Sequence, residues 1–359
     1  MAAVNNSVPA PEIESVAVTI KDFCPEVVHK WDHFLALHPQ ATPFHSTAWM
    51  RALQRTFGYD NRSFLVIRDG RVTGVLPLFF ISNWIVGRCL ISIPFADYGG
   101  ICAADEESAD ALVEHALEMA VAERVDFLEL RHRTGKPSAR FFVNDLYVSF
   151  ATELASDPQT QLKRFPRDTR YMIRKGEKAG LEVRSGLEQL PEFYKLFTLN
   201  WRRFGTPVFS RQWLETLVQE FKEDATLIMA RANGRPVAGV FSLLCGDALY
   251  PHYSGASPDA NSLAANNFIY WELMKRAIDQ RMRRFDFGRS KQNTGAYQFK
   301  SSWNMEATPL YYQVCMVERK SPPNFSPVNP KFALAANMWS RMPLKATTLL
   351  GPHVVRWFP

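Results

Sequence analysis

The residues best suited to chemistry lie close together near position 290. An alternating apolar strand, which we expect to stop at Gly288, is followed at once by two cations and a hydroxyl group. These three residues are Arg289, Ser290 and Lys291. A glycine at a strand end lets the backbone turn sharply or approach a ligand, and clustered cations bind anionic groups. The pattern predicts a substrate-binding strand end, with an ordinary solvated loop as the alternative.

A second segment with functional side chains, which contains Tyr297 and Lys300, follows within nine residues of Lys291. A carboxylate, Asp286, precedes the glycine in the motif Asp-Phe-Gly, which also occurs in protein kinases. A kinase is excluded, because neither a His-Arg-Asp catalytic loop nor a glycine-rich phosphate loop precedes the motif.

The composition indicates a folded protein in a reducing compartment. Of the 359 residues, 47% are hydrophobic and 13% aromatic, which suits two ordinary domains or one large one. The net charge of +6 favours anionic partners but is too small for a general nucleic-acid-binding protein, so no DNA partner is expected. The five cysteines never show Cys-x-x-Cys spacing, which argues against a zinc ribbon or a disulfide scaffold.

The sequence shows no secretory signal, because no basic segment followed by an apolar run opens the chain. It also lacks a stretch of about eighteen apolar residues, the minimum for a membrane-spanning helix. We therefore expect a cytoplasmic protein, with contact at the inner face of the membrane as a variant of that expectation. No metal and no tightly bound cofactor are expected.

The chain repeats one order of elements: two helices, an antiparallel meander, a helix and a strand. Asp-Gly at 69–70 and Asn-Gly at 233–234 each separate two apolar runs, which is a strong hairpin signal. Gly70 and Gly234 are 164 residues apart, and Gly74 and Gly239 are 165 residues apart. This common spacing indicates an internal duplication of an α/β unit.

In the first copy we expect helices at 27–37, after Ser46 or Thr47, and around 112–121, and strands at 16–20, 64–68, 72–80, 90–95 and 126–131. In the second copy we expect helices around 193–197 and 213–217 and at 267–280, with strands at 226–232, 237–245, 248–253 and 285–288. The predicted divisions are a flexible leader (1–15), an N-terminal domain (16–155), a basic connecting segment (156–185), a C-terminal domain expected to be catalytic (186–320) and a tail (321–359).

Two segments outside the repeat carry charge or aromatic residues. Residues 161–184 hold eight cationic and three acidic side chains, and Arg167, Arg170 and Arg174 recur at helical spacing. We expect either a solvated helix face or a surface that binds a phosphorylated substrate such as tRNA. The tail mixes aromatic residues with isolated cations, which suits a membrane surface or packing against the second domain.

Several motifs together resemble a known family. They are Phe-Asp-Phe-Gly-Arg-Ser-Lys at 285–291, Gly-x-Tyr-x-Phe-Lys-x-x-Trp at 295–303, Pro-Phe-x-x-Tyr-Gly-Gly at 94–100, Gly-Thr-Pro-Val-Phe at 205–209, Ala-Asn at 265–266 and Asn-Pro-Lys at 329–331. The chain resembles the FemAB-related proteins of bacterial PEP-CTERM/exosortase and exopolysaccharide loci, from about residue 49 to residue 352. It departs from the usual pattern at His252, Ser254 and Asn304.

The resemblance implies an α/β (α+β) fold of tandem GNAT-like domains, each a mixed, largely antiparallel sheet flanked by helices. It also implies transfer of an acyl or aminoacyl group to an amine or hydroxyl of a cell-envelope or exopolysaccharide precursor. A non-catalytic binding or assembly factor of that pathway is the alternative. The donor would be an acyl-CoA, an acyl carrier or an aminoacyl-tRNA. No Arg/Gln-x-x-Gly-x-Gly/Ala run precedes the helix at 267–280, which weakens the case for acetyl-CoA.

Acyl transfer needs an aligned nucleophile, a route for its proton and positive charge beside the developing oxyanion. We expect Lys300 and Arg289 to supply positive charge, to the oxyanion or to donor phosphates. We expect Asp286 to act as a base or to orient the acceptor, with a structural salt bridge to Arg289 or Arg284 as its alternative role. Tyr253 and His252 are candidates for a proton relay, with packing in an aromatic core as the alternative role of Tyr253 and of Tyr98. Residues expected to bind substrate are Ser290, Lys291, Tyr297, Asn266, Tyr98, Asp97 and Arg131.

Overall fold

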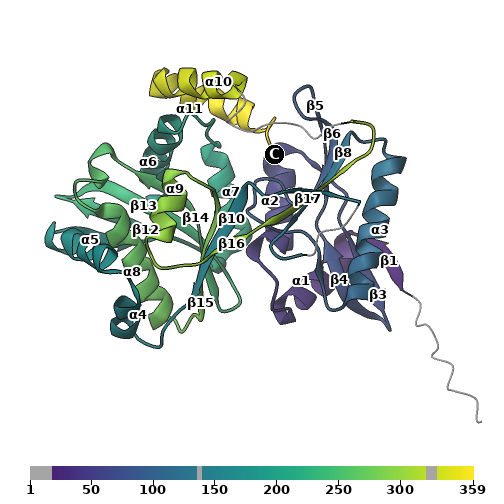
Figure 1. Ribbon diagram of the computed structural model, residues 1–359, viewed down its shortest axis with the longest axis horizontal. Coiled ribbons are helices and arrows are strands. Elements are labelled where there is room, and N and C mark those ends of the chain that lie inside the picture. Colours follow the sequence, from purple (N-terminus) through teal and green to yellow (C-terminus); the bar gives the residue numbers. More distant parts are fainter. Residues whose placement is uncertain (1–17, 136–139, 321–329) are drawn as a thin grey trace, which may run out of the picture.

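The computed structural model describes residues 18–135, 140–320 and 330–359, so the predicted leader lies outside the described residues (Figure 1). The N-terminal domain contains α1 (Val28–Leu37), α2 (Thr47–Phe57) and α3 (Glu106–Ala122). One of its sheets has the order β1 (Thr19–Asp22), β3 (Phe64–Arg68), β4 (Arg71–Leu76) and β7 (Cys102–Ala103). The other has the order β2 (Asp60–Asn61), β5 (Phe79–Asn83), β6 (Gly87–Ile91), β8 (Phe127–His132), β17 (Tyr311–Met316) and β9 (Phe142–Asn144).

The C-terminal domain is built on one seven-stranded sheet. Its order is β11 (Glu182–Ser185), β12 (Ala225–Ala232), β13 (Arg235–Cys245), β14 (Ala248–Ala256), β15 (Arg284–Lys291), β10 (Tyr147–Glu153) and β16 (Ala307–Pro309). The remaining helices are α4 (Pro158–Arg164), α5 (Arg167–Lys178), α6 (Leu190–Arg203), α7 (Arg211–Phe221), α8 (Ala265–Asp279), α9 (Gly295–Ser301), α10 (Pro330–Arg341) and α11 (Leu344–Val355). Short 3-10 turns lie at Pro25–Val27, Pro43–His45, Leu187–Gln189, Lys222–Asp224 and Pro258–Ala260.

The predicted duplication is confirmed by the pairing of the strands. In both domains an antiparallel meander is followed by a helix and then by a strand parallel to the last meander strand, β8 beside β6 and β15 beside β14. The equivalent helices α2 and α7 even begin in the same way. The Ser46 hydroxyl accepts a hydrogen bond from the Trp49 N–H, and the Ser210 hydroxyl accepts one from the Trp213 N–H. Each serine satisfies a backbone donor that the first helical turn leaves open.

The prediction of one continuous strand at 72–80 is wrong. The structure divides it into β4 and β5, which belong to different sheets. Pro77 lies in the gap between them. Proline cannot donate to a strand ladder, so an inner strand tends to break there. The second copy has no proline at this point and runs unbroken as β13.

The two domains exchange their final strands. β10, which precedes residue 155, pairs with β15 in the C-terminal sheet, while β17, near residue 314, pairs with β8 in the N-terminal sheet. A division of the chain at 155 and 320 therefore cuts across both sheets. The crossing strands run between the domains in Figure 1. Each domain is completed by a strand from the other half of the sequence.

An aromatic core joins the domains where α2 packs against α7. The rings of Trp49 and Trp213 are buried and meet edge to face, with their centroids 5.3 Å apart. Phe57 also contacts Trp213, at 5.1 Å. Buried aromatic pairs contribute large apolar areas and a fixed geometry. This interface holds the two domains in one arrangement around the cleft described below.

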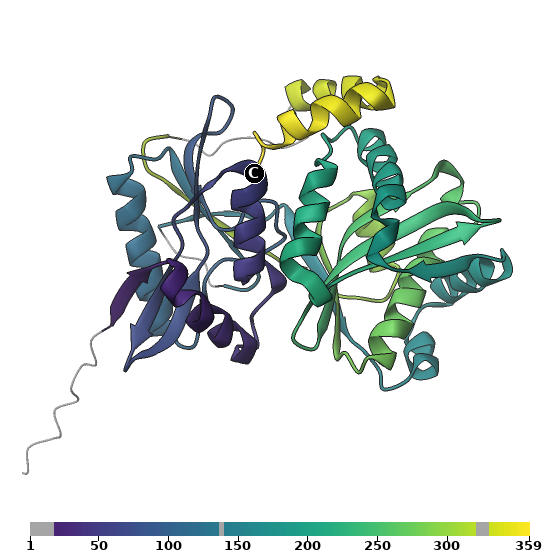
Figure 2. The same ribbon diagram turned by 180° about the vertical axis from the view of Figure 1, so that it is seen from behind.

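The tail helices α10 and α11 pack along one side of the molecule, over the end of α6 (Figures 1 and 2). Arg202 of α6 donates a hydrogen bond to the Met342 carbonyl, 3.2 Å away. At the other end, the Trp357 ring contacts Trp84 of the N-terminal domain, with centroids 5.4 Å apart. The tail thus packs on both domains. Among the described residues, no helix combines the length and apolar character needed to cross a bilayer.

Candidate active site

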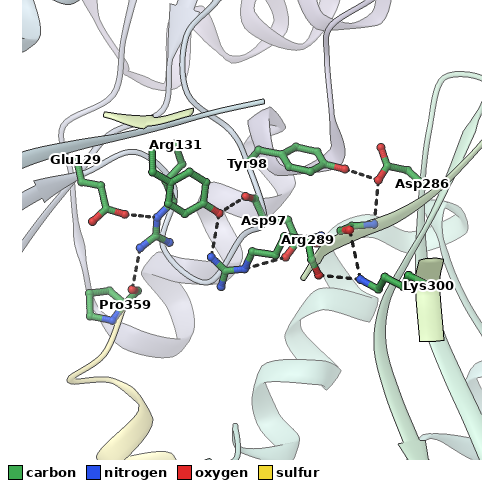
Figure 3. Close-up of polar contacts among 10 residues, drawn as sticks. Asp97, Tyr98, Glu129, Arg131, Asp286, Arg289, Lys300 and Pro359 are labelled. Carbon is green, nitrogen blue, oxygen red and sulfur yellow. Dashed lines mark hydrogen bonds and ion pairs between the residues drawn. The ribbon is translucent and has the colours of Figure 1, made fainter. Parts of the chain in front are cut away.

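The candidate site lies where β15 of the C-terminal domain meets the Asp97–Tyr98 turn of the N-terminal domain (Figure 3). The prediction that the strand stops at Gly288 is wrong, because β15 continues to Lys291. Residues 289–291 remain in the sheet because they pair with 147–149 of the exchanged strand β10. The sequence did not indicate this partner. The pairing shifts register at Phe287, which forms a β-bulge, and a bulge bends the strand locally.

Gly288 permits close contact between the domains. Its backbone has φ +69°, which favours glycine, and a Cβ atom there would lie only 2.1 Å from Asp97 Oδ2. The Asp97 carboxylate instead accepts a hydrogen bond from the Arg289 backbone N–H, 3.2 Å away. The absence of a side chain at Gly288 therefore lets the Asp97 carboxylate reach the strand.

Asp286 is fully buried and receives several donors. The Tyr98 hydroxyl and the Gly288 N–H, the latter at 2.9 Å, both donate to its Oδ1. Arg133 and Arg284 approach its Oδ2 at 3.3 and 3.5 Å. Burial raises the pKa of Asp286, while Arg133 and the hydrogen bonds oppose that rise. The predicted salt bridge with Arg284 is present, whereas Arg289 pairs with Asp97 instead.

Arg289 is held by both domains. Its Nε lies 3.3 Å from Asp97 Oδ1, and its Nη1 donates to the Tyr312 hydroxyl at 2.9 Å. The Tyr312 hydroxyl in turn donates to the Asp97 carbonyl. The guanidinium lies 4.9 Å from the centre of the Tyr147 ring, a cation–π distance. Both tyrosines come from the exchanged strands, so the exchange itself builds the environment of Arg289.

Lys300 approaches the same strand from α9, which begins after the capping residue Thr294. Its ammonium group donates to the carbonyl oxygens of Arg289 and Gly288, at 2.7 and 3.3 Å. Burial lowers the pKa of Lys300 to about 8, although Asp97 and Asp286 counteract part of that effect. The side chain is therefore mostly cationic at neutral pH. An ammonium has three protons, and these two bonds use two of them.

The two relay candidates occupy different environments on β14. The Tyr253 hydroxyl accepts a hydrogen bond from Trp213 Nε1 at 2.9 Å, inside the aromatic core. His252 packs against Phe44 and Trp49, with ring centroids 5.0 and 5.2 Å away. Burial lowers the pKa of His252 to about 4, so the imidazole is neutral at pH 7. Within the part of the chain that the structure describes, His252 Nε2 has no hydrogen-bond partner.

The structure brings Asp97, Tyr98, Asp286, Arg289 and Lys300 together and places the other predicted residues around them (Figure 3). Ser290 is buried on β15 opposite Val148, and Lys291 ends the strand opposite Tyr147.

The remaining predicted substrate-binding residues lie on other elements. Tyr297 packs its ring on Phe150. Asn266 lies in the first turn of α8. Arg131 pairs with Glu129 at 2.7 Å and donates to the Pro359 carbonyl at 3.0 Å.

Two cavities are lined by Arg133 and Arg284, the two arginines that pair with the buried Asp286. One cavity has a volume of about 1120 Å³ and lies between the domains, bounded by α1 and α2 on one side and by residues 220–224 and 244–250 on the other. The other has a volume of about 380 Å³, and His45, His132 and Ser149 contribute to its lining. Among the described residues, none that lines the smaller cavity carries a carboxylate, so the potential there favours an anionic group.

Sequence reasoning missed Tyr147, Tyr312 and Arg133. Each lies outside the motif segments, and each reaches the site through the strand exchange or from the end of β8. Only the pairing of β10 with β15 and of β17 with β8 reveals the positions of the two tyrosines. The position of Arg133, two residues after Arg131 at the end of a predicted strand, was the one available signal.

Comparison with known proteins defines the class of this fold. A family model described as an acetyltransferase (GNAT) domain matches residues 163–301. The crystal structure of FemX superposes with a TM-score of 0.65 at 16% identity, covering 84% of this chain and 98% of that one. A C-terminal domain from Agrobacterium fabrum, assigned to a lysylphosphatidylglycerol synthetase, gives a TM-score of 0.54 at 15% identity, with 90% and 96% covered. The chain therefore has a fold of duplicated GNAT-like domains.

One named relative is more specific. The UDP-N-acetylmuramoylpentapeptide-lysine N(6)-alanyltransferase of Weissella viridescens is 27% identical over 135 residues. The match spans 37% of this chain and 40% of the length of that relative. The chain therefore spans less than half the length of this curated relative, and the similarity is confined to that part.

Proposed function

We propose that this protein transfers an acyl or aminoacyl group to an amine or hydroxyl of a cell-envelope or exopolysaccharide precursor. One observation carries the proposal above the others. Lys300, with its pKa lowered to about 8, directs a buried ammonium group at the Gly288 and Arg289 carbonyl oxygens, where β15 meets the Asp97 carboxylate of the other GNAT-like domain. A cation next to a carboxylate suits a reaction that loses a proton from one atom while a neighbouring oxygen becomes negative.

The proposed transfer is an addition to the donor carbonyl followed by loss of the leaving group. The acceptor nitrogen or oxygen attacks the carbonyl carbon of the donor, and the carbonyl electron pair moves onto its oxygen, beside the Lys300 ammonium. Collapse of this intermediate breaks the bond from carbon to the donor oxygen or sulfur. The proton released by the nucleophile passes to Asp97 and then to the leaving group. Arg289 keeps Asp97 oriented through its Nε contact at 3.3 Å.

In this scheme Asp286 orients the site rather than accepting the proton, because its side chain is fully buried whereas that of Asp97 is 18% exposed. The Asp286 oxygens face Tyr98, Gly288, Arg133 and Arg284. It therefore fixes the Asp97–Tyr98 turn against β15. His252, neutral near pH 7, remains the candidate for a proton relay, while Tyr253 supports it from the aromatic core.

For the donor, the structure offers a basic helix. In α5, Arg174, Lys175 and Lys178 are exposed along one stretch. Exposed cations of this kind attract phosphate groups with a strong dependence on salt. We assign this helix to the phosphates of an aminoacyl-tRNA, in keeping with the aminoacyl group named for the Weissella viridescens relative. An acyl-CoA or an acyl carrier is the other donor class.

For the acceptor, we assign the smaller of the two cavities. Arg133 and Arg284 direct two guanidinium groups at one carboxylate, which leaves excess positive charge at the wall of this cavity. The larger cavity is also lined by Asp32, Glu220, Glu223, Asp224 and Asp247 and lacks this excess. An acceptor with phosphate or carboxylate groups, as an envelope or polysaccharide precursor has, would fit that potential.

Titration of the purified protein with aminoacyl-tRNA, acetyl-CoA and longer acyl-CoAs tests the proposal, with Lys300→Ala in parallel. The proposal predicts that one donor binds and that this donor binds more weakly to the variant. Lys195→Ala, an exposed lysine on α6, is the matched control and should bind normally. Failure of every donor to bind would contradict the proposal.

One observation favours a second function, that of a non-catalytic assembly factor. Tyr98 pairs with Asp286 across the domain boundary, and Arg289 pairs with Asp97 and Tyr312 across it, as in a purely structural polar network. In that case the cleft would bind an envelope precursor without reaction. Acceptor binding with no product from any donor would identify this function.

A further inference from the structure

One side of the molecule carries apolar side chains that nothing in the described structure covers. Figures 1 and 2 show the tail helices α10 and α11 along this side, and Figure 1 shows the β5–β6 turn reaching the same side. We call this surface the tail face. Its exposed apolar residues are Trp84, Phe204, Leu334, Met338, Leu349 and Leu350. Trp84 is 78% exposed and Leu349 is 71% exposed. Contacts within the molecule therefore cover only a small part of either side chain.

The tail face is continuous although it is built from three separate segments. Trp84 contacts Trp357, just beyond the end of α11. Phe204 is the capping residue that follows the last residue of α6. Arg202, in the last turn of that helix, donates a hydrogen bond to the carbonyl of Met342, which lies between the two tail helices. Leu334 and Met338 are four residues apart on α10 and so share one side of the helix. Apolar residues gathered this way mark an interaction surface more often than chance exposure.

The charges of the tail face have a single sign. Residues 330–359 contain no aspartate or glutamate, and neither do the β5–β6 turn at 82–88 and the segment 201–211. Exposed cations lie among the apolar residues, namely Arg203, Arg341 and Lys345. Interleaved apolar and cationic side chains without acidic ones match a surface that is both apolar and negatively charged. Anionic lipids in a bilayer provide such a surface.

We infer that the tail face is a peripheral docking site for an anionic membrane. The apolar side chains of α10, α11, Phe204 and Trp84 enter the boundary between headgroups and acyl chains, and the cations pair with lipid phosphates. A soluble protein partner would need an acidic surface complementary to this one, and that is the competing outcome of the test. The docking site is separate from the cleft, so it does not depend on the transfer reaction proposed above.

Co-sedimentation of the full chain with vesicles tests this site directly. The protein should bind vesicles of phosphatidylcholine mixed with phosphatidylglycerol, bind phosphatidylcholine alone much more weakly, and lose part of its binding in high salt. Leu334→Ser combined with Met338→Ser should weaken binding about fivefold or more, since both side chains leave the apolar phase. Arg341→Glu combined with Lys345→Glu should weaken it about tenfold or more.

Matched controls change other faces in the same way. Leu37→Ser with Val121→Ser removes two exposed apolar side chains of the N-terminal domain, and Lys175→Glu with Lys178→Glu reverses two charges on α5. Both controls should bind vesicles as the unaltered protein does. Thermal unfolding of each variant verifies that it is folded. Absence of vesicle binding, or a loss confined to the α5 variant, would overturn the proposal.

Discussion

The Tyr98 hydroxyl donates a hydrogen bond to the buried carboxylate of Asp286, although the two residues are 188 positions apart and belong to different domains. Around this contact, Gly288 brings Asp97 against β15, and Arg289 and Lys300 bring positive charge to the same point. The contact therefore couples the stability of the domain interface to the geometry of the candidate site. The predictions below separate these two contributions.

Removal of the Tyr98 hydroxyl should destabilise the protein. Tyr98→Phe leaves the buried Asp286 with one donor fewer, which costs about 1–3 kcal/mol for a buried polar group. Urea unfolding at neutral pH measures the change in the free energy of unfolding. The matched control is Tyr171→Phe on α5, where the side chain is 65% exposed and no change is expected. Equal stability of the two variants would show that the Tyr98–Asp286 contact contributes nothing.

Gly288→Ala should damage both stability and function. The new methyl group would lie 2.1 Å from Asp97 Oδ2, and the backbone has φ +69°. The left-handed backbone alone costs about 1 kcal/mol for a residue other than glycine, and the clash adds to it. Gly180→Ala provides the control, because φ there is +68° but nothing lies within 4 Å of the added atom. The free energy of unfolding should fall more for Gly288→Ala than for Gly180→Ala.

If Gly288→Ala and Gly180→Ala lost the same stability, the close approach of Asp97 to the strand would be irrelevant. A second measurement distinguishes a local from a global effect. Gly288→Ala should reduce donor turnover even in conditions where the protein remains fully folded, and Gly180→Ala should not.

Transfer activity should fall as the pH rises above about 8, because burial lowers the pKa of Lys300 to about that value. A lysine is cationic below its pKa and neutral above it, and the proposed step needs the cation. Lys300→Arg keeps the positive charge at higher pH. The activity of this variant should be lower at pH 7, because the geometry is altered, but it should not fall further as the pH rises above 8. An activity that rises through pH 8 would show instead that neutral Lys300 acts as a base.

Salt dependence should locate the donor. If α5 contacts tRNA phosphates, then Arg174→Ala, Lys175→Ala and Lys178→Ala combined should reduce the magnitude of the negative slope of log affinity against log salt by about 2, since each phosphate contact contributes about 0.7–0.9. The control alters three exposed cations elsewhere, Lys195, Lys222 and Arg235. A slope that is unchanged in the α5 variant would exclude tRNA contacts on this helix.

The motifs in the sequence predicted much of the site but not its surroundings. Asp97, Tyr98, Asp286, Arg289 and Lys300 were all candidates from their spacing or from a family resemblance, and the structure brings them together. Tyr147 and Tyr312 were not candidates, because their strands exchange between domains and nothing local to either residue encodes the new neighbour. The same exchange explains why β15 runs on through Lys291 instead of ending at Gly288.

The fold was predicted more completely than the site because its signals are local or periodic. Asp-Gly and Asn-Gly turns, the Ser46 cap and the common spacing of the glycines lie within short windows or repeat along the chain. The break at Pro77 was available in the sequence, yet the apolar run around it masked its effect. The pairing of a strand with a partner 140 residues away is set by the whole core, and a pattern within the strand does not specify it.

Product formation tests the central claim most directly. The purified protein would be incubated with a labelled aminoacyl-tRNA or acyl-CoA and a panel of envelope and polysaccharide precursors, alongside Lys300→Ala and the control Lys195→Ala. The account predicts that label moves from donor to acceptor, that Lys300→Ala lowers the rate by about a hundredfold or more, as loss of an oxyanion-stabilising group does, and that Lys195→Ala does not. Transfer by Lys300→Ala at the rate of the unaltered protein would contradict it.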